Sequence, residues 1–295
     1  MKNVFTMAMS QAVVIFLIAV HQEKGYSQEL PPVFLNHVYL VLDQQTYQDI
    51  HNSDFMINDF GFFEERTTNS NNGKSWSGIY FYGKQTYIEF FMEGISPQFN
   101  KGESAIGFGV EVAGSLDIYN SRLKEIFGDR VDKELVTKKL NNEDIPWFFA
   151  SGVDYGDEQT FFDWLMEYEK NYLKNVYTNL KVEEDGISRQ QNLSRMFDSK
   201  RLFKNIKEVT IALDQKERER LIQELEVFNY KIVGKKNKMV AIGPEIKFYI
   251  IDNARGNGIK KLKIELNRRI SQKRTLKFGS ASVLTLQGRT AFWTF

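Results

Sequence analysis

The chain has no cysteine, three histidines, no surplus of charge of either sign, and no apolar run long enough to span a membrane. Without cysteine the protein has no disulfide, no thiol nucleophile and no thiolate metal site. Its stability must therefore come from a packed core, for which 24 phenylalanines and 13 tyrosines supply the bulk. The small number of histidines severely limits any metal site.

The balance of charge also restricts the partners that the protein can have. The chain contains 39 lysines and arginines against 38 aspartates and glutamates. Because no excess of cations is present to replace phosphate counterions, we expect no nucleic acid partner. The sequence contains no Gly-x-Ser-x-Gly, no phosphate-binding loop and no His-Glu-x-x-His, so the common hydrolase and protease motifs are missing.

The N-terminus has the pattern of a secretion signal. Lys2 precedes an apolar run over residues 12–20, and small residues follow at Gly25 and Ser27. A membrane-spanning helix needs about 20 apolar residues, roughly twice this run. We therefore predict that residues 1–27 are a signal peptide, cleaved after Ser27 or Gln28. The product is expected to be periplasmic or extracellular, without a stable membrane anchor.

The pattern beyond residue 28 predicts an α+β protein built from a repeated unit. Residues 34–43 are predicted as a strand, 47–60 as a helix, and 62–67, 75–82 and 86–92 as strands. This β-α-β-β-β order begins again at residues 104–112, and residues 206–214 repeat the first strand closely. A fourth unit is predicted to begin over residues 259–266. An internal repeat of this kind predicts tandem βαβββ units that form cupped mixed sheets.

Residues 160–177 are rich in aromatic side chains and lie between the second and third units. We predict them as a helix with one broad apolar face, followed by a second helix over residues 188–197. The expected organisation is a paired βαβββ domain over residues 28–155, a helical connector over 156–204, and a C-terminal βαβββ domain over 205–295.

Paired βαβββ units resemble the vicinal oxygen chelate superfamily, which includes glyoxalase I, extradiol dioxygenases and bleomycin-resistance proteins. The segments LNHVYLVLD, TYIEFF and SRMFDSKRLFKNIKEVTIALD also resemble a family of exported bacterial proteins of unknown function. In metal-using members of the superfamily, the first strand of a unit supplies a histidine and its last strand a glutamate. The resemblance places these roles on His37 and Glu89, which we predict as catalytic and metal-binding residues.

The strand faces agree with this interpretation, but the set of ligands is incomplete. The alternation predicts that Leu35, His37, Tyr39 and Val41 share one face, on which Glu89 would meet the imidazole. Imidazole and carboxylate suit Zn²⁺, Fe²⁺, Ni²⁺ and Mn²⁺. A catalytic metal generally has three protein ligands. The equivalent positions of the later units, however, carry Gly107 and Glu208, and Asp154 is the nearest carboxylate at the end of the second unit.

A metal-free alternative pairs His37 with Glu89 by a hydrogen bond, which would raise the pKa of the imidazole. This polar pair would then lie in a small-molecule pocket with aromatic walls. The predicted ligand-binding residues are Tyr39, Trp76, Tyr80, Tyr82 and Trp147.

Three functions follow, and the sequence leaves open whether the protein is an enzyme. The first is an exported small-molecule-binding protein of glyoxalase-like fold. The second is a divalent-metal-dependent lyase, isomerase or dioxygenase that uses His37 and Glu89. The third is a protein–protein interaction module that uses the aromatic connector or residues 292–295. Oligomerisation is left open.

Overall fold

The computed structural model describes residues 30–69, 75–95, 99–140, 143–156, 159–176, 185–235, 238–253 and 256–295. Residues Pro31–Phe295 form one compact unit. The predicted signal peptide lies outside the described residues. Among the described helices, none combines the length and the apolar character that crossing a membrane requires.

The first βαβββ unit forms where the sequence predicts it. Its elements are β1 (Phe34–Leu42), α1 (Gln44–His51), a π-helical turn (Met56–Phe60), β2 (Phe62–Asn69), β3 (Ser75–Tyr82) and β4 (Tyr87–Met92). Helix α1 begins because the side chain of Asp43 accepts a hydrogen bond from the backbone N–H of Thr46, as an N-cap aspartate does. The helical segment is interrupted after His51 and ends before Gly61.

The second unit is complete only with a strand that the sequence pattern did not reveal. Its elements are β5 (Ser104–Val110), α2 (Ser115–Phe127), a 3₁₀ turn (Gly128–Arg130), β6 (Val131–Leu140), β7 (Glu143–Val153) and β8 (Phe161–Tyr168). The prediction of one helix over residues 160–177 is wrong, because residues 161–168 form β8, which pairs in parallel with β5. Glu167 on β8 accepts hydrogen bonds from the backbone N–H groups of Gly114 and Leu116, at the start of α2. These bonds anchor the helix to the new strand.

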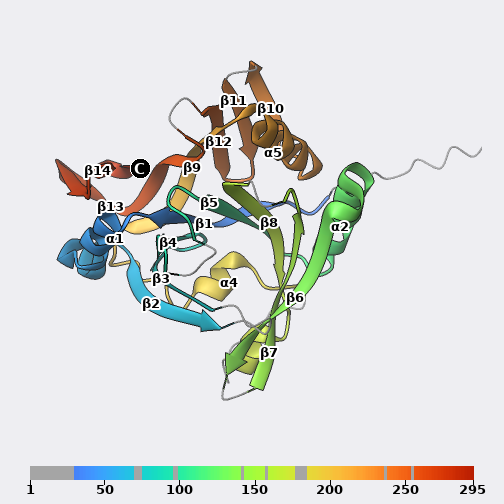
Figure 1. Ribbon diagram of the computed structural model, residues 1–295. Helices are drawn as coiled ribbons and strands as arrows, with labels where there is room; N and C mark the ends of the chain where they lie inside the picture. The colour runs from blue at the N-terminus through green and yellow to red at the C-terminus, as the bar shows by residue number, and fades with distance from the viewer. Residues whose placement is uncertain are drawn as a thin grey trace, which may run out of the picture. The chain divides into compact units, whose positions relative to one another are not determined.

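These eight strands form one curled sheet. Their order is β2-β3-β4-β1-β5-β8-β7-β6, with β1 and β5 antiparallel at the centre. The two edge strands, β2 and β6, contact each other, so the sheet closes around its concave face (Figure 1). We call this concave face the first cup.

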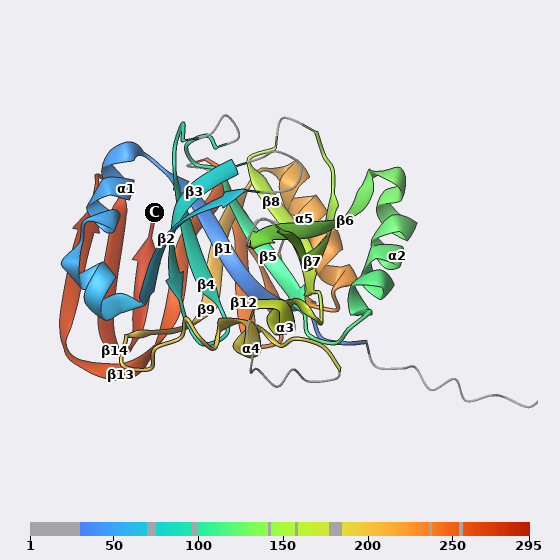
Figure 2. The same cartoon turned by 90° about the horizontal axis from the view of Figure 1, so that it is seen from below.

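In the structure, the connector begins after Tyr168 rather than at residue 156, and it crosses the first cup. It contains α3 (Tyr172–Val176) and α4 (Arg189–Leu193), and Figures 1 and 2 together show α4 across one end of the ring of strands. Leu193 packs with Val41 and Tyr80, while Ile187 packs with Met166. The connector therefore covers the cup and adds apolar side chains to its lining.

A second sheet of six strands follows. The third unit comprises β9 (Phe203–Leu213), α5 (Gln215–Val227), β10 (Lys231–Lys235), β11 (Lys238–Gly243) and β12 (Ile246–Asp252). The predicted fourth unit is instead a long hairpin of β13 (Gly258–Phe278) and β14 (Ser282–Thr294). The strand order is β10-β11-β12-β9-β13-β14, and Figure 2 shows β9 and β12 running beside the strands of the first sheet.

The main core lies between the convex backs of the two sheets. The aromatic rings of Phe90 and Trp293 are 5.0 Å apart, and those of Phe108 and Phe248 are 5.7 Å apart. Trp293 is fully buried, whereas the neighbouring Phe292 is 37% exposed. The hypothesis that residues 292–295 contact a partner is therefore wrong for Trp293, because its indole packs in the core.

A buried charged cluster also joins the sheets. Arg220 on α5 lies 2.9 Å from the carboxylate of Asp163 on β8, and Glu224 accepts a hydrogen bond from Tyr155. Burial and the negative charge of Asp163 raise the pKa of Glu224 well above its usual range. This cluster accounts for buried charges at the interface without invoking a ligand.

Candidate functional site

His37 reaches the first cup through a bulge in β1. The pairing of β1 with β5 shifts between Leu35 and His37, so Asn36 is the extra residue of a β-bulge. Leu35 pairs with Phe108, which packs in the core between the sheets. Since opposite residues on paired strands share a face, Leu35 faces the core rather than the cup. The prediction that Leu35 shares the face of His37 is therefore wrong, and Asn36 takes that place.

The imidazole of His37 is enclosed on all sides by this arrangement. Its ring stacks on Tyr87 with 4.5 Å between centroids, and the edge of Trp164 lies 5.2 Å away. A Cβ atom at position 107 would collide with the imidazole, so Gly107 leaves the room that His37 needs. A histidine side chain at position 107 would therefore collide with His37.

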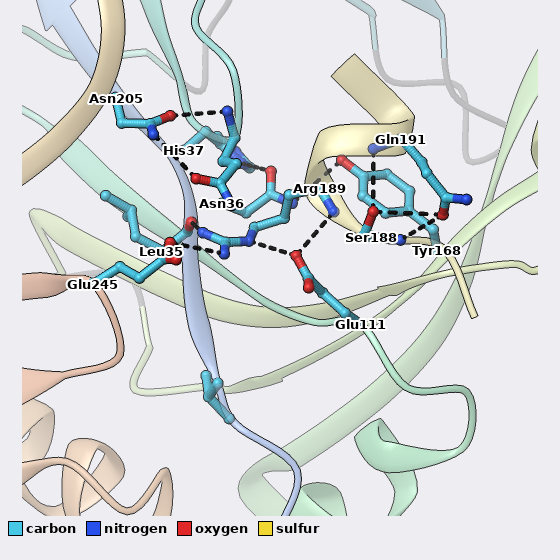
Figure 3. A network of polar contacts seen from close by, with 12 residues as sticks. Leu35, Asn36, His37, Glu111, Tyr168, Ser188, Arg189, Gln191, Asn205 and Glu245 are labelled. Carbon is cyan, nitrogen blue, oxygen red and sulfur yellow. Dashed lines mark hydrogen bonds and ion pairs between the residues drawn. The ribbon is translucent and has the colours of Figure 1, made fainter. Parts of the chain in front are cut away.

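The protonation of His37 follows from its burial. Desolvation, together with the positive charge of Arg66, lowers the pKa of His37 to about 3. The imidazole is therefore neutral at physiological pH. Its Nδ1 lies 3.1 Å from Oδ1 of Asn36, whose Nδ2 donates to the hydroxyl of Tyr168 (Figure 3). In this network Nδ1 carries the proton and Nε2 is left as an acceptor.

Glu89 occupies the position that the resemblance assigns to it. It lies opposite Tyr39 in the pairing of β1 with β4, and it is 8% exposed. Burial raises the pKa of Glu89 to about 7, and the charge of Arg66 offsets this only in part. Its Oε1 lies 4.0 Å from Nε2 of His37, too far for a direct hydrogen bond. The expectation that pairing raises the pKa of the imidazole is therefore wrong, because burial dominates.

The donors around His37 do not fit a catalytic divalent metal. In the part of the chain that the structure describes, no group of three or more histidine, aspartate or glutamate side chains is placed to hold one. Gly107 faces the imidazole, and Glu208 belongs to the second sheet. Asp154 follows β7 rather than the last strand of the second unit. Among the described residues, a third protein ligand, which such sites usually require, is therefore lacking.

Three charged residues that the sequence analysis missed lie near the edges of the cup. The guanidinium of Arg66 lies 4.1 Å from the ring centre of Tyr80 and donates to Glu64. Lys138, on the opposite edge strand, lies 5.2 Å from the ring centre of Trp147. Burial and then the charge of Arg66 lower the pKa of Lys138. The alternation of charged and neutral residues on these strands was the available signal, but it is also typical of a solvated face.

The predicted aromatic walls form two groups rather than one. Tyr39, Trp76, Tyr80 and Tyr82 gather in one cluster with Leu193 of the connector. Trp147 lies in a second cluster, which includes Tyr168 and Tyr172. Trp164 lies near both, because it belongs to the second cluster and is 6.2 Å from Tyr39. It was assigned to the connector helix, so its place beside His37 was missed.

Arg189 fastens the connector across the cup. Its side chain donates to Glu111 over 2.8 Å and to the carbonyl of Leu35 over 2.9 Å (Figure 3). The guanidinium also lies 4.1 Å from the ring centre of Phe34, and its side chain is only 4% exposed. Because Leu35 immediately precedes the bulge, the same arginine holds both the connector and the strand that presents His37.

The contrast between His37 and His51 gives a direct test of the site. Hydrogen bonding to Glu65 raises the pKa of His51, whose side chain is partly exposed. We expect the NMR resonances of the His51 ring to titrate above pH 6.5, while those of His37 show a neutral imidazole from pH 8 to pH 5. A His37 ring that gained a proton in this range would contradict the enclosed geometry.

The βαβββ units and the two curled mixed sheets define an α+β protein. More specifically, the chain belongs to the Family of unknown function (DUF5829), whose model matches residues 35–295. No curated protein matches the sequence.

Three solved structures are similar to this chain at low sequence identity. A hypothetical protein from Staphylococcus aureus is 11% identical with a TM-score of 0.54, and the match covers 83% of this chain and 95% of that one. A xylose isomerase-like TIM barrel/4-hydroxyphenylpyruvate dioxygenase fusion protein is 9% identical with a TM-score of 0.41, covering 81% and 38%. A putative dioxygenase from Bacillus subtilis subsp. subtilis str. 168 is 14% identical with a TM-score of 0.28, covering 78% and 67%.

Proposed function

We propose that this is an exported small-molecule-binding protein whose ligand binds in the first cup, with Glu89 and His37 as the polar centre. The observation that carries the proposal is a carboxyl group with a pKa of about 7, 4.0 Å from a neutral imidazole that packs against the rings of Tyr87 and Trp164. At neutral pH Glu89 can either donate or accept a hydrogen bond, and Nε2 of His37 can accept one. Aromatic walls around a few convergent polar groups are typical of ligand sites.

The cations at the edge of the cup indicate the polarity of the ligand. Lys138 is partly buried and forms no ion pair with another described residue, while Arg66 already has Glu64 as a partner. A partly buried cation is stabilised by an opposite charge. We therefore propose a ligand that combines an apolar body, in contact with the aromatic walls, and an anionic group directed toward Lys138.

Because the connector covers the cup, this proposal requires the connector to move before a ligand can bind. Leu193 and Met196 pack against the aromatic cluster, so a ligand of any size requires the connector to shift. Arg189 adds polar contacts that hold the connector in place, through Glu111 and Leu35. Loosening these bonds is thus the step that would give access to Glu89.

The metal-dependent alternative has less support from the geometry. A lyase, isomerase or dioxygenase of this superfamily would need further ligands besides His37 and Glu89, and the described residues do not supply them. Metal analysis of the chain from Gln28 onward, beside His37→Ala and Glu89→Ala, tests this alternative. Near-stoichiometric metal that both substitutions abolish would favour it over the metal-free proposal.

The binding proposal is tested with aromatic and aliphatic carboxylates and their neutral amides, by thermal shift and tryptophan fluorescence. We expect carboxylates to bind more tightly than their amides, and Lys138→Met to weaken the carboxylates by about tenfold, the effect of losing one charged hydrogen bond. Lys139→Met is the matched control, because Lys139 is the next residue and is exposed. Equal binding by wild type, Lys138→Met and Glu89→Gln would contradict the proposal.

A further inference from the structure

The second sheet carries a small cavity that the proposed function does not use. Its volume is about 190 Å³, and it lies on strands β9, β12 and β13. The residues that line it are Glu208, Thr210, Tyr249, Lys261 and Lys263. All five are partly exposed, whereas His37 and Glu89 in the first cup are buried.

Strand pairing shows that this cavity is the counterpart of the His37 site. The sequence repeat aligns β1 with β9, so that His37 corresponds to Glu208 and Tyr39 to Thr210. Tyr39 pairs with Glu89 on the neighbouring parallel strand, and Thr210 pairs in the same way with Tyr249. The repeated fold therefore places a polar site at the same position in both sheets.

The antiparallel neighbours extend this correspondence. His37 faces Gly107 and Tyr39 faces Ala105, while Glu208 faces Lys263 and Thr210 faces Lys261. The bulge also recurs, because the pairing of β9 shifts between Ile206 and Glu208 just as that of β1 shifts beside Asn36. Two small residues of the first cup are thus replaced by two lysines.

The charges around this cavity favour an anion. Lys263 forms an ion pair with Glu208 over 2.7 Å, whereas Lys261 lies 4.4 Å from the ring centre of Phe292. No carboxylate is paired with Lys261 among the ion pairs of the described residues. Nearby, Lys204 and Lys207 share the single carboxylate of Glu265. Cations therefore outnumber carboxylates in and around the cavity.

We propose that the cavity binds a small organic or inorganic anion, through a carboxylate or phosphate group. Lys261 and Lys263 supply the charge, and the hydroxyl groups of Tyr249 and Thr210 donate hydrogen bonds to the oxygen atoms. Charge-assisted hydrogen bonds from lysine suit both kinds of oxyanion. This site lies on a different sheet from the first cup and goes beyond the proposed function.

The test uses inorganic phosphate and succinate as probes, with NMR shift titrations at low ionic strength. We expect saturable shifts at Tyr249 and Lys261 with at least one probe. Tighter binding of phosphate assigns the site to phosphate compounds, and tighter binding of succinate assigns it to carboxylic acids. Lys261→Gln and Lys263→Gln are each expected to weaken binding about tenfold, because each removes one charged hydrogen bond.

Glu208→Gln provides a variant with the opposite expected effect. Removal of this carboxylate frees Lys263 from its ion pair, so the anion should bind several-fold more tightly. Lys231→Gln, an exposed lysine of β10 outside the cavity, is the matched control and should leave binding unchanged. Absence of saturable binding, or equal weakening by Lys231→Gln, would overturn the proposal. Glu89→Gln should not affect this site, so failure here is distinct from failure of the first-cup proposal.

Discussion

Trp293→Ala is expected to lower the free energy of unfolding by about 3–5 kcal/mol, the usual cost of truncating a buried tryptophan. The indole is fully buried between the two sheets. It contacts Phe90 of the first sheet and Phe278 of the second, and its N–H donates to Ser282 over 2.9 Å. Urea denaturation followed by circular dichroism measures the loss without relying on tryptophan fluorescence.

Phe292→Ala is the matched control for this substitution. Phe292 is adjacent in sequence, but its side chain is 37% exposed and lies beside Lys261 on the outer face of the sheet. We expect a loss of less than about 1 kcal/mol, as is usual for partly exposed positions. If the two substitutions had equal effects, the packing of the sheets through Trp293 would be refuted.

Glu89→Gln is expected to gain stability relative to the wild type as the pH rises. The pKa of Glu89 is raised from 4.5 to about 7 in the folded chain, so the folded state keeps its proton when the unfolded state has lost it. The contribution of Glu89 to the stability of the folded wild type is therefore largest below about pH 4.5. That contribution is lost as the pH rises through about 7, and glutamine has no proton to lose.

The size of this change follows from the shift in pKa. At 1.36 kcal/mol for each pKa unit, the difference in unfolding free energy between Glu89→Gln and the wild type should change by about 3 kcal/mol between pH 4.5 and pH 8. His37 has a lowered pKa, which gives the opposite slope as the pH falls below 6.5, and this slope is common to both proteins. Glu134→Gln, at an exposed position of β6, supplies the baseline. A difference that stays constant with pH would refute the buried carboxyl.

These two results would bear on function in different ways. The Trp293 experiment tests how the two sheets are joined and says nothing of a ligand. The Glu89 experiment tests whether the first cup holds a group that exchanges a proton near neutral pH, which the binding proposal requires. Export, with removal of residues 1–27, is a separate part of the proposal and can fail while both stability predictions hold.

The sequence alone predicted most of the strands and the repeated unit. Short alternating segments such as those that became β3 and β4 carry a period of two, and this period predicts a strand without tertiary information. The match between residues 34–43 and 206–214 identified the third unit in the same way. Asp43 and Asp214, one at the end of each matching strand, cap the following helices by the same local hydrogen bond.

Errors occurred where local pattern and tertiary pairing disagree. The segment that forms β8 has apolar residues at both helical and strand spacings, and only its parallel pairing with β5 decides between them. The bulge at Asn36 depends on the pairing of β1 with β5. The alternation of residues along β1 therefore could not show that Leu35 faces the core rather than the cup. Trp164 and Lys138 were missed for a related reason. They reach the cup only through strand pairing between segments that are distant in sequence.

The sequence by itself determined the α+β class, the repeated βαβββ units and the helix caps at Asp43 and Asp214. These features depend on periodicity and on short-range hydrogen bonds. Only the tertiary structure decided the neutral state of His37, the raised pKa of Glu89 and the covering of the cup by the connector. Burial and the charge of Arg66 control the two pKa values, and both arise when strands and connector pack together.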